Sequence, residues 1–138
     1  MRILALDVGQ ATIGIAVSDE LGWTAQGVTT IRRQSRAKDF RALGALIAEY
    51  TPEKLVIGLP KNIDGSIGTH AQKIIEFAGE LSRRFNIPVI TWDERFSTMG
   101  AERYLLEFEL SSRKRKKVVD KMAAAFILQG YLDRRSFA

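Results

Sequence analysis

The chain has 138 residues, 46% of them hydrophobic and none of them cysteine, so we expect one folded domain over residues 1–138 without disulfides, thiolate zinc sites or a cysteine nucleophile. No apolar run approaches the roughly 20 residues of a membrane span, and no signal-peptide cleavage site is present, so we expect a cytoplasmic protein with no membrane partner. The net charge is +5, from 21 basic and 16 acidic residues.

The excess of positive charge is local. Five of the 21 bases stand together, and without them 16 bases balance the 16 acids. Such a block is typical either of a solvated loop or of a contact with a polyanion. The block consists of Arg113, Lys114, Arg115, Lys116 and Lys117.

The first third of the chain is predicted to form an antiparallel meander. The expected strands cover residues 2–8, 12–18 and 23–31, where apolar residues run or alternate between turn residues. Asp7 closes the apolar run of the first strand and opens a glycine-marked segment. A carboxylate at the mouth of a buried strand is costly unless something positive compensates it, and a metal ion is one common solution.

The rest of the chain is predicted to alternate helices and strands. In the last helix, Val119, Met122, Ala123, Phe126, Ile127 and Tyr131 are expected to face inward; Trp23 and Trp92 are expected in the core and His70 at the surface. The expected elements are a helix over 37–50, a strand over 55–57, a helix opened by a capping box of Thr69 and Gln72 and ended by Asn86 and Pro88, a strand over 89–92, a helix from Ser97 or Thr98 to 109, and a helix over 118–133.

This order of elements predicts an α/β fold with a mixed five-stranded sheet. Hairpins make the first three strands antiparallel, whereas helices between the later strands imply parallel crossovers, with helices on both faces of the sheet. The first strand is expected at the centre of the sheet. Asp7 then lies at the carboxyl end of that strand, where ligands bind in such sheets.

Three acids are the candidates for chemistry: Asp7, Glu94 after the fifth strand, and Asp120 in the first turn of the last helix. Metal-dependent phosphoryl transfer needs carboxylates from different elements around one point, and Mg²⁺ suits such oxygen ligands. Each acid also has a structural interpretation. Asp7 could cap the following turn, Glu94 could pair with Arg95, and Asp120 could complement a helix N-terminus.

Four segments in order resemble the YqgF family, described both as Holliday junction resolvases and as pre-16S ribosomal RNA nucleases. They are DVGQATIGIAVSD (7–19), VIGLPKNIDG (56–65), DERFST (93–98) and KVVDKMAA (117–124). The resemblance spans the whole chain. It implies a ribonuclease H-like fold, with Asp7, Glu94 and Asp120 as the metal-binding catalytic set and Mg²⁺, or Mn²⁺ in its place, as the cofactor.

The chain departs from the family pattern at some positions. Ala11 and Thr12 stand where the family often has a basic pair, and Phe96 replaces the more usual leucine. Many related nucleases use four acids, and here only Asp93 and Asp64 are candidates for a helper. Adjacent strand residues point to opposite sides, so we expect Glu94 rather than Asp93 to face the site.

We therefore expect a Mg²⁺-dependent nuclease that uses water as the nucleophile and needs no nucleotide cofactor. The resemblance favours processing of precursor 16S ribosomal RNA over Holliday junction resolution on branched DNA. The expected contacts to nucleic acid are Asn62, Arg95 and the block 113–117. The structural alternatives are a local turn role for Asn62, an ion pair with Asp93 for Arg95 and a solvated loop for the block.

Two other classes are weighed against this one. A non-catalytic nucleic-acid-binding module is disfavoured because all three acids are retained. An actin-like or sugar-kinase ATPase pairs two related domains around its nucleotide, and 138 residues hold only one. The sequence does not distinguish RNA from DNA as the substrate, or a monomer from a homodimer.

Overall fold

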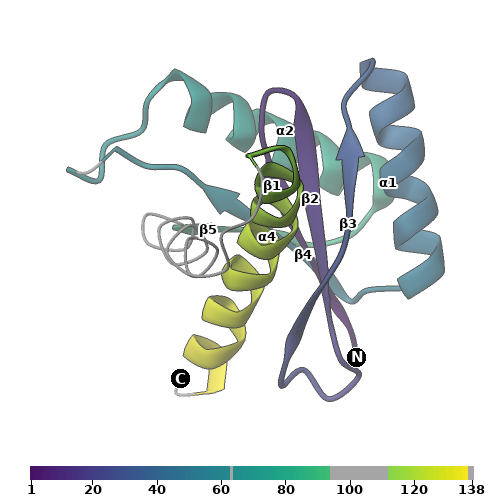
Figure 1. Ribbon diagram of the computed structural model, residues 1–138. Helices are drawn as coiled ribbons and strands as arrows, with labels where there is room; N and C mark the ends of the chain where they lie inside the picture. The colour runs from purple at the N-terminus through teal and green to yellow at the C-terminus, as the bar shows by residue number, and fades with distance from the viewer. Residues whose placement is uncertain (63, 94–111, 137–138) are drawn as a thin grey trace.

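A five-stranded mixed sheet forms the middle layer of the molecule, with strand order β3-β2-β1-β4-β5 (Figure 1). The computed structural model describes residues 1–62, 64–93 and 112–136, with the backbone alone for residues 112–121 and 136. The pairs β1–β2 and β2–β3 are antiparallel, and β1–β4 and β4–β5 are parallel. The expected mixed sheet with a central first strand is confirmed. The strands are β1 (Ile3–Val8), β2 (Thr12–Ser18), β3 (Ala25–Arg32), β4 (Lys54–Leu59) and β5 (Val89–Asp93).

Helices cover both faces of the sheet. Helices α1 (Arg36–Tyr50) and α2 (Thr69–Phe85) lie on one face, and α4 (Ser112–Ser136) crosses the other (Figure 1). The alternation of side chains along each strand supplies both apolar layers. The face under α1 and α2 takes Leu4, Leu6, Val8, Ile13, Ile15, Leu55 and Ile57, and the face under α4 takes Ile3, Ala5, Ala16 and Val56.

Helix α1 begins at a side-chain cap, whereas α2 begins without one. Ser35 caps α1, since its hydroxyl accepts the backbone N–H of Lys38 at 3.2 Å. The expected capping box of Thr69 and Gln72 is wrong, because Gly68 precedes the helix and no side chain caps it. Asn86 ends α2 in the left-handed conformation, with φ 51°, as expected from the sequence.

Helix α4 starts earlier than the sequence analysis predicted. It begins at Ser112 rather than at 118, so the block 113–117 lies in a helix and not in a loop. Lys and Arg are good helix formers, but they carry no apolar period that would reveal the helix. Asp120 consequently lies more than two turns inside α4, and its expected position in the first turn is wrong.

The buried stripe of α4 also differs from the expectation. Ala123 and Ile127 are buried as expected, and Met122 is half-buried. Phe126, however, is 37% exposed, and the buried positions instead include Ala124, Leu128 and Leu132. Position 126 lies roughly 200° around the helix from the buried positions 124 and 128, so Phe126 points away from the sheet.

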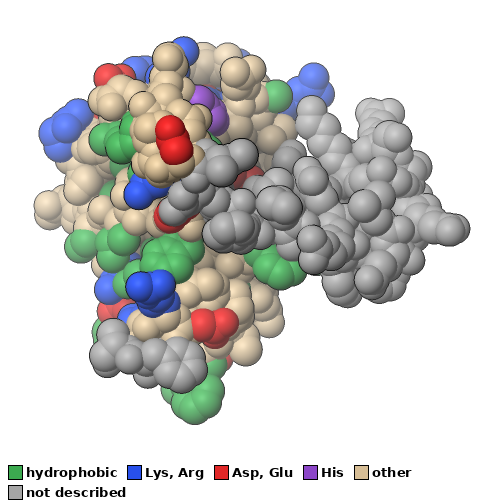
Figure 2. All heavy atoms as spheres, turned by 90° about the vertical axis from the view of Figure 1, so that its left-hand side faces the viewer, with side chains coloured by type: hydrophobic (Ala, Val, Ile, Leu, Met, Phe, Trp, Pro, Cys, Tyr) green, Lys and Arg blue, Asp and Glu red, His purple; other side chains and the backbone are tan. Residues whose placement is uncertain are grey.

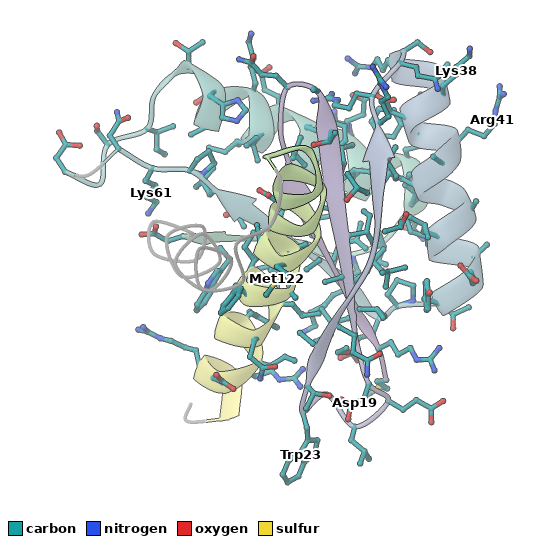
Figure 3. The ribbon with its side chains drawn as sticks, viewed as in Figure 1. Asp19, Trp23, Lys38, Arg41, Lys61 and Met122 are labelled. Atoms are coloured by element: carbon teal, nitrogen blue, oxygen red, sulfur yellow. The ribbon has the colours of Figure 1, made fainter. Side chains whose placement is uncertain are left out.

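The two tryptophans have different environments. Trp23 is 74% exposed at the tip of the β2–β3 hairpin, so its expected place in the core is wrong (Figure 3). Trp92 packs as expected, edge-on against Tyr131 of α4 with ring centroids 5.9 Å apart. His70 is at the surface, as expected.

The helix expected from Ser97 or Thr98 to 109 lies outside the described residues. Within the described ranges, none of the helices has the length and apolar character needed to cross a bilayer.

Candidate active site

Asp7 lies near the carboxyl end of the central strand, on the face covered by α4. Leu4, Leu6 and Val8 pack on the side of α1 and α2, while Ile3 and Ala5 pack under α4. Asp7 follows Ala5 by two positions and therefore shares the α4 face. Its side chain is half-buried. The fold thus holds a carboxylate at the end of a buried strand, as the sequence predicts.

Glycines flank Asp7 on both neighbouring strands. Gly14 of β2 is the direct partner of Asp7 in the antiparallel pair. On the other side Leu6 pairs with Ile57, which brings Gly58 of β4 level with Asp7. Neither neighbouring strand therefore places a side chain beside the carboxylate on this face. The sequence analysis includes Gly14 in the motif 7–19 and Gly58 in the motif 56–65, but it does not bring Gly58 beside Asp7, because that position depends on the register between β1 and β4.

Gly9 has a different role from Gly14. Its N–H donates to the carbonyl oxygen of Thr12 at 2.8 Å, which closes the turn between β1 and β2. A Cβ atom at this position would lie 3.2 Å from the same oxygen, so the turn has little space for a side chain. Gly9 is therefore a turn residue directly behind Asp7.

The N-terminal part of α4 lies at the end of the sheet where β1 ends (Figure 1). Ala124 and Ile127 are buried against the sheet. Position 120 precedes them by four and seven residues and so falls on the same stripe of the helix, one turn closer to its N-terminus. The side chain of Asp120 is outside the described part of the chain, as are the side chains of residues 113–117.

The end of β5 separates Asp93 from Asp7. Trp92 contacts Tyr131 on the α4 face, whereas Asp93 pairs with Leu59, which packs on the face of α1 and α2. Asp93 therefore occupies the opposite face of the sheet from Asp7. Glu94 and Arg95 follow directly and lie outside the described residues. The ends of β1 and β5 are roughly 10 Å apart, because one strand stands between them.

The loop after β4 is braced by its own polar side chains. The Asn62 amide donates to the Ser66 hydroxyl at 2.9 Å. The carboxylate of Asp64 accepts the backbone N–H of Ser66 at 2.9 Å and its hydroxyl at 2.6 Å. These contacts match the local turn interpretation of Asn62. Lys61, which the sequence analysis left out, projects from this loop on the side of the molecule where β5 lies (Figure 3).

The donor set suits a hard cation. Carboxylate oxygens are the ligands that Mg²⁺ and Mn²⁺ prefer, and the glycines level with Asp7 on the neighbouring strands carry no side chain. Among the described side chains, no three acids or histidines gather closely enough to hold a metal ion. Of the three expected ligands, only Asp7 has a side chain in the described part of the chain.

Charge on the described surface is mixed. Figure 2 shows the side of the molecule that lies on the left in Figure 1. On this side, Lys and Arg side chains are interspersed with acidic ones, without one large basic patch among the described residues. Arg36 of α1 and Arg84 of α2 both pair with Glu80. On this side of the molecule, the described side chains therefore form no basic surface that could bind a polyanion in place of the block 113–117.

Comparison with known proteins identifies the family. The model of the RuvX family, described as Holliday junction resolvase, matches residues 1–134. The chain belongs to the RuvX family. The YqgF family named above is this same family, so the match confirms the resemblance carried by the four sequence motifs.

Curated relatives match the chain over nearly its whole length. A protein of Moorella thermoacetica described as "Putative pre-16S rRNA nuclease" is 54% identical over 134 residues, which cover 97% of this chain and 96% of the relative. A protein of Desulforamulus reducens with the same description is 51% identical over 133 residues, covering 96% and 97%.

Solved structures show the same fold. The Thermus thermophilus RuvC in complex with a Holliday junction substrate has a TM-score of 0.58 at 14% identity, over 99% of this chain and 96% of that one. The fowlpox virus resolvase in complex with Holliday junction DNA has a TM-score of 0.59 at 15% identity, over 98% and 99%. At such identities the similarity concerns the fold alone, and it confirms the expected ribonuclease H-like architecture.

Proposed function

We propose that this protein is a metal-dependent nuclease that hydrolyses phosphodiester bonds in structured nucleic acid, with precursor 16S ribosomal RNA as its substrate. The observation that carries the proposal is the half-buried Asp7 at the carboxyl end of the central strand, between two glycines. Relatives more than 50% identical over nearly the whole chain are described as nucleases of this RNA. Such a substrate places the activity in the cytoplasm.

Asp7, Glu94 and Asp120 are the proposed ligands of Mg²⁺, with Mn²⁺ as a substitute. Helical register supports Asp120, because position 120 continues the stripe of α4 that packs on the sheet. Strand alternation supports Glu94, since Trp92 lies on the α4 face and the position two residues later returns to that face in a continued strand. When bound, the ion supplies electrostatic stabilisation of the charge on the reacting phosphate.

The remaining residues act on the substrate. Arg95 and Asn62 are proposed to contact phosphate groups near the cleaved bond, and Arg113–Lys117 to hold the flanking backbone. The block belongs to the N-terminal part of α4, which lies at the same end of the sheet as the end of β1. A block of positive charge next to the acids would raise the affinity for a polyanion without taking part in bond cleavage.

Branched DNA is the alternative substrate. The family description and the fold of two junction-bound resolvases favour it. A nuclease acting on either substrate would use the same acids, so substrate choice and catalysis need separate measurements. A non-catalytic binding module is the third alternative.

Cleavage of two substrates side by side tests the proposal. Purified protein is incubated with precursor 16S ribosomal RNA and with a four-way DNA junction, in Mg²⁺ and in EDTA, with Asp7→Asn as the matched control. We expect Mg²⁺-dependent cleavage of the RNA that Asp7→Asn lacks. Cleavage of the junction alone would support the DNA alternative, and binding of either substrate without cleavage would support the binding module.

A further inference from the structure

Arg33 holds the turn that follows Asp7. It comes directly after β3, and its guanidinium donates from Nη1 to the carbonyl oxygen of Gly9 at 2.8 Å. Its backbone N–H donates to the carbonyl oxygen of Ala11 at 2.9 Å. Together with the bond from Gly9 to Thr12, these contacts hold both arms of the turn between β1 and β2.

Arg33 is itself fixed from both helices on the far face of the sheet. Its Nε donates to the carboxylate of Asp39 in α1 at 3.3 Å, and its guanidinium carbon lies 5.6 Å from the ring centroid of Phe77 in α2. Asp39 is only 4% exposed and also accepts the backbone N–H of Gln34 at 3.0 Å. A buried carboxylate with these partners keeps the arginine in one orientation.

We propose that Arg33 and Asp39 form a clamp that positions Asp7 for its part in the active site. The proposal rests on the nuclease function proposed above and adds two positioning residues to it. Gly9 is two residues from Asp7, so movement of the turn changes where the end of β1 places its carboxylate. A displacement of about 1 Å at a reacting group can cost about a hundredfold in rate.

Conservative variants separate this clamp from a purely structural role. Arg33→Lys keeps the charge but loses the fork that reaches Gly9 and Asp39 together. Asp39→Asn keeps the shape and the acceptor oxygen but removes the charge. Three quantities are measured in each folded variant: the affinity for Mn²⁺ without substrate by calorimetry, hydrogen exchange at the Gly9 amide, and kcat and KM for cleavage.

For Arg33→Lys we expect faster exchange at Gly9, Mn²⁺ affinity lower by about tenfold, and kcat lower by about tenfold with KM nearly unchanged. Asp39→Asn should show the same pattern with smaller changes. If Arg33→Lys fails to fold, Asp39→Asn carries the test. The Asp7→Asn variant gives the reference for loss of the metal ligand.

Arg36→Lys is the matched control. Arg36 pairs with Glu80, so this pair also joins α1 to α2. Arg36 lines the same groove of about 890 Å³ as Arg33, but the hydrogen bond to the carbonyl oxygen of Gly9 comes from Arg33. We expect wild-type Mn²⁺ affinity and kcat in this control. Wild-type values in Arg33→Lys and Asp39→Asn, or equal losses in Arg36→Lys, would overturn the clamp.

The outcomes for the clamp and for the nuclease are distinguishable. If the wild-type protein cleaves neither nucleic acid, the nuclease proposal fails. Exchange at Gly9 and the Mn²⁺ affinity of Arg33→Lys would still decide whether the clamp positions Asp7. A wild-type protein that binds no Mn²⁺ would contradict both.

Discussion

Asp7 faces Gly14 directly across the antiparallel pair of β1 and β2. Directly opposed residues in such a pair have Cβ positions roughly 5 Å apart, so any side chain at position 14 would stand beside the carboxylate. A glycine inside a strand lowers stability by roughly 0.5–1 kcal/mol relative to alanine. This pairing therefore leaves space next to Asp7 at a cost in stability, as expected where a ligand must reach the carboxylate.

Gly14→Ala should lower cleavage without lowering stability. The added methyl group would occupy space beside Asp7, and we expect kcat to fall by about tenfold, while the thermal unfolding temperature stays equal or rises. Gly27→Ala in the exposed part of β3 is the control and should cleave normally. A stable Gly14→Ala protein with the wild-type kcat would show that this space is not needed.

Asp7→Asn should abolish cleavage with the fold intact. The change removes one metal-ligand charge and keeps the shape, and we expect a loss of about three orders of magnitude or more in kcat. The half-buried side chain keeps its size in this variant, so the unfolding temperature of the metal-free protein should stay close to that of the wild type. Single-turnover cleavage and thermal unfolding in EDTA test the two halves of this prediction. Full activity would remove Asp7 from the site.

Glu94 and Asp120 should act as one unit with Asp7. Glu94→Gln and Asp120→Asn should each cost nearly as much activity as the double variant, because members of a catalytic set are strongly non-additive. Asp93→Asn is the matched control, since Asp93 shares the face of Leu59 rather than that of Trp92. Normal cleavage by Glu94→Gln together with an inactive Asp93→Asn would exchange the two assignments.

The block Arg113–Lys117 should set affinity rather than chemistry. Replacing its bases with glutamine should weaken substrate binding and reduce the slope of log affinity against log salt by roughly 0.7–0.9 for each lost phosphate contact. The rate at saturating substrate should change far less. Glutamine also keeps helix propensity, so the circular dichroism of α4 should be retained. An unchanged salt slope would mean that this turn of the helix touches no phosphate.

Asp19 should make stability depend on pH at the β2–β3 hairpin. Its carboxylate accepts the N–H of Trp23 at 2.7 Å, and this bond, together with that from Thr24, lowers the pKa of Asp19. Because the folded-state pKa is depressed, the stabilisation is present above the unfolded pKa and is lost as pH falls through the folded pKa.

The unfolding temperature of Asp19→Asn should therefore lie below that of the wild type at pH 6. The difference should begin to shrink near pH 4, roughly the unfolded-state pKa, and should vanish only once the pH is below the folded-state pKa. Glu20→Gln removes the neighbouring, exposed carboxylate and serves as the control. An equal pH dependence in both variants would contradict a specific role for Asp19.

The sheet could be predicted from the sequence because its signals are local. Alternating Ile and Val define β2, and the expected bounds of that strand agree with the structure. The start of α4 could not be predicted in this way, since a run of Lys and Arg forms a helix without an apolar period. Trp23 was wrongly assigned to the core, because the size of its indole side chain does not show whether the residue lies under a helix or at the exposed tip of a hairpin.

Part of the candidate site could be proposed from the sequence for the same reason. Asp7 stands out as an acid at the end of an apolar run. Gly58 and Arg33 do not, because the first depends on the register of a parallel strand pair and the second on two helices meeting at a turn. Such relationships arise only when segments far apart in the chain are packed together.

Helix α4 follows all five strands in the chain, yet it covers the face of the sheet that carries Asp7. A ribosome making this protein would therefore release Asp7 first and the helix bearing Asp120 last. Until α4 docks, Ile3, Ala5, Ala16 and Val56 lack their cover, and the proposed ligand set is incomplete. Nuclease activity would thus be switched on by the completion of folding, and not by the appearance of any single catalytic residue.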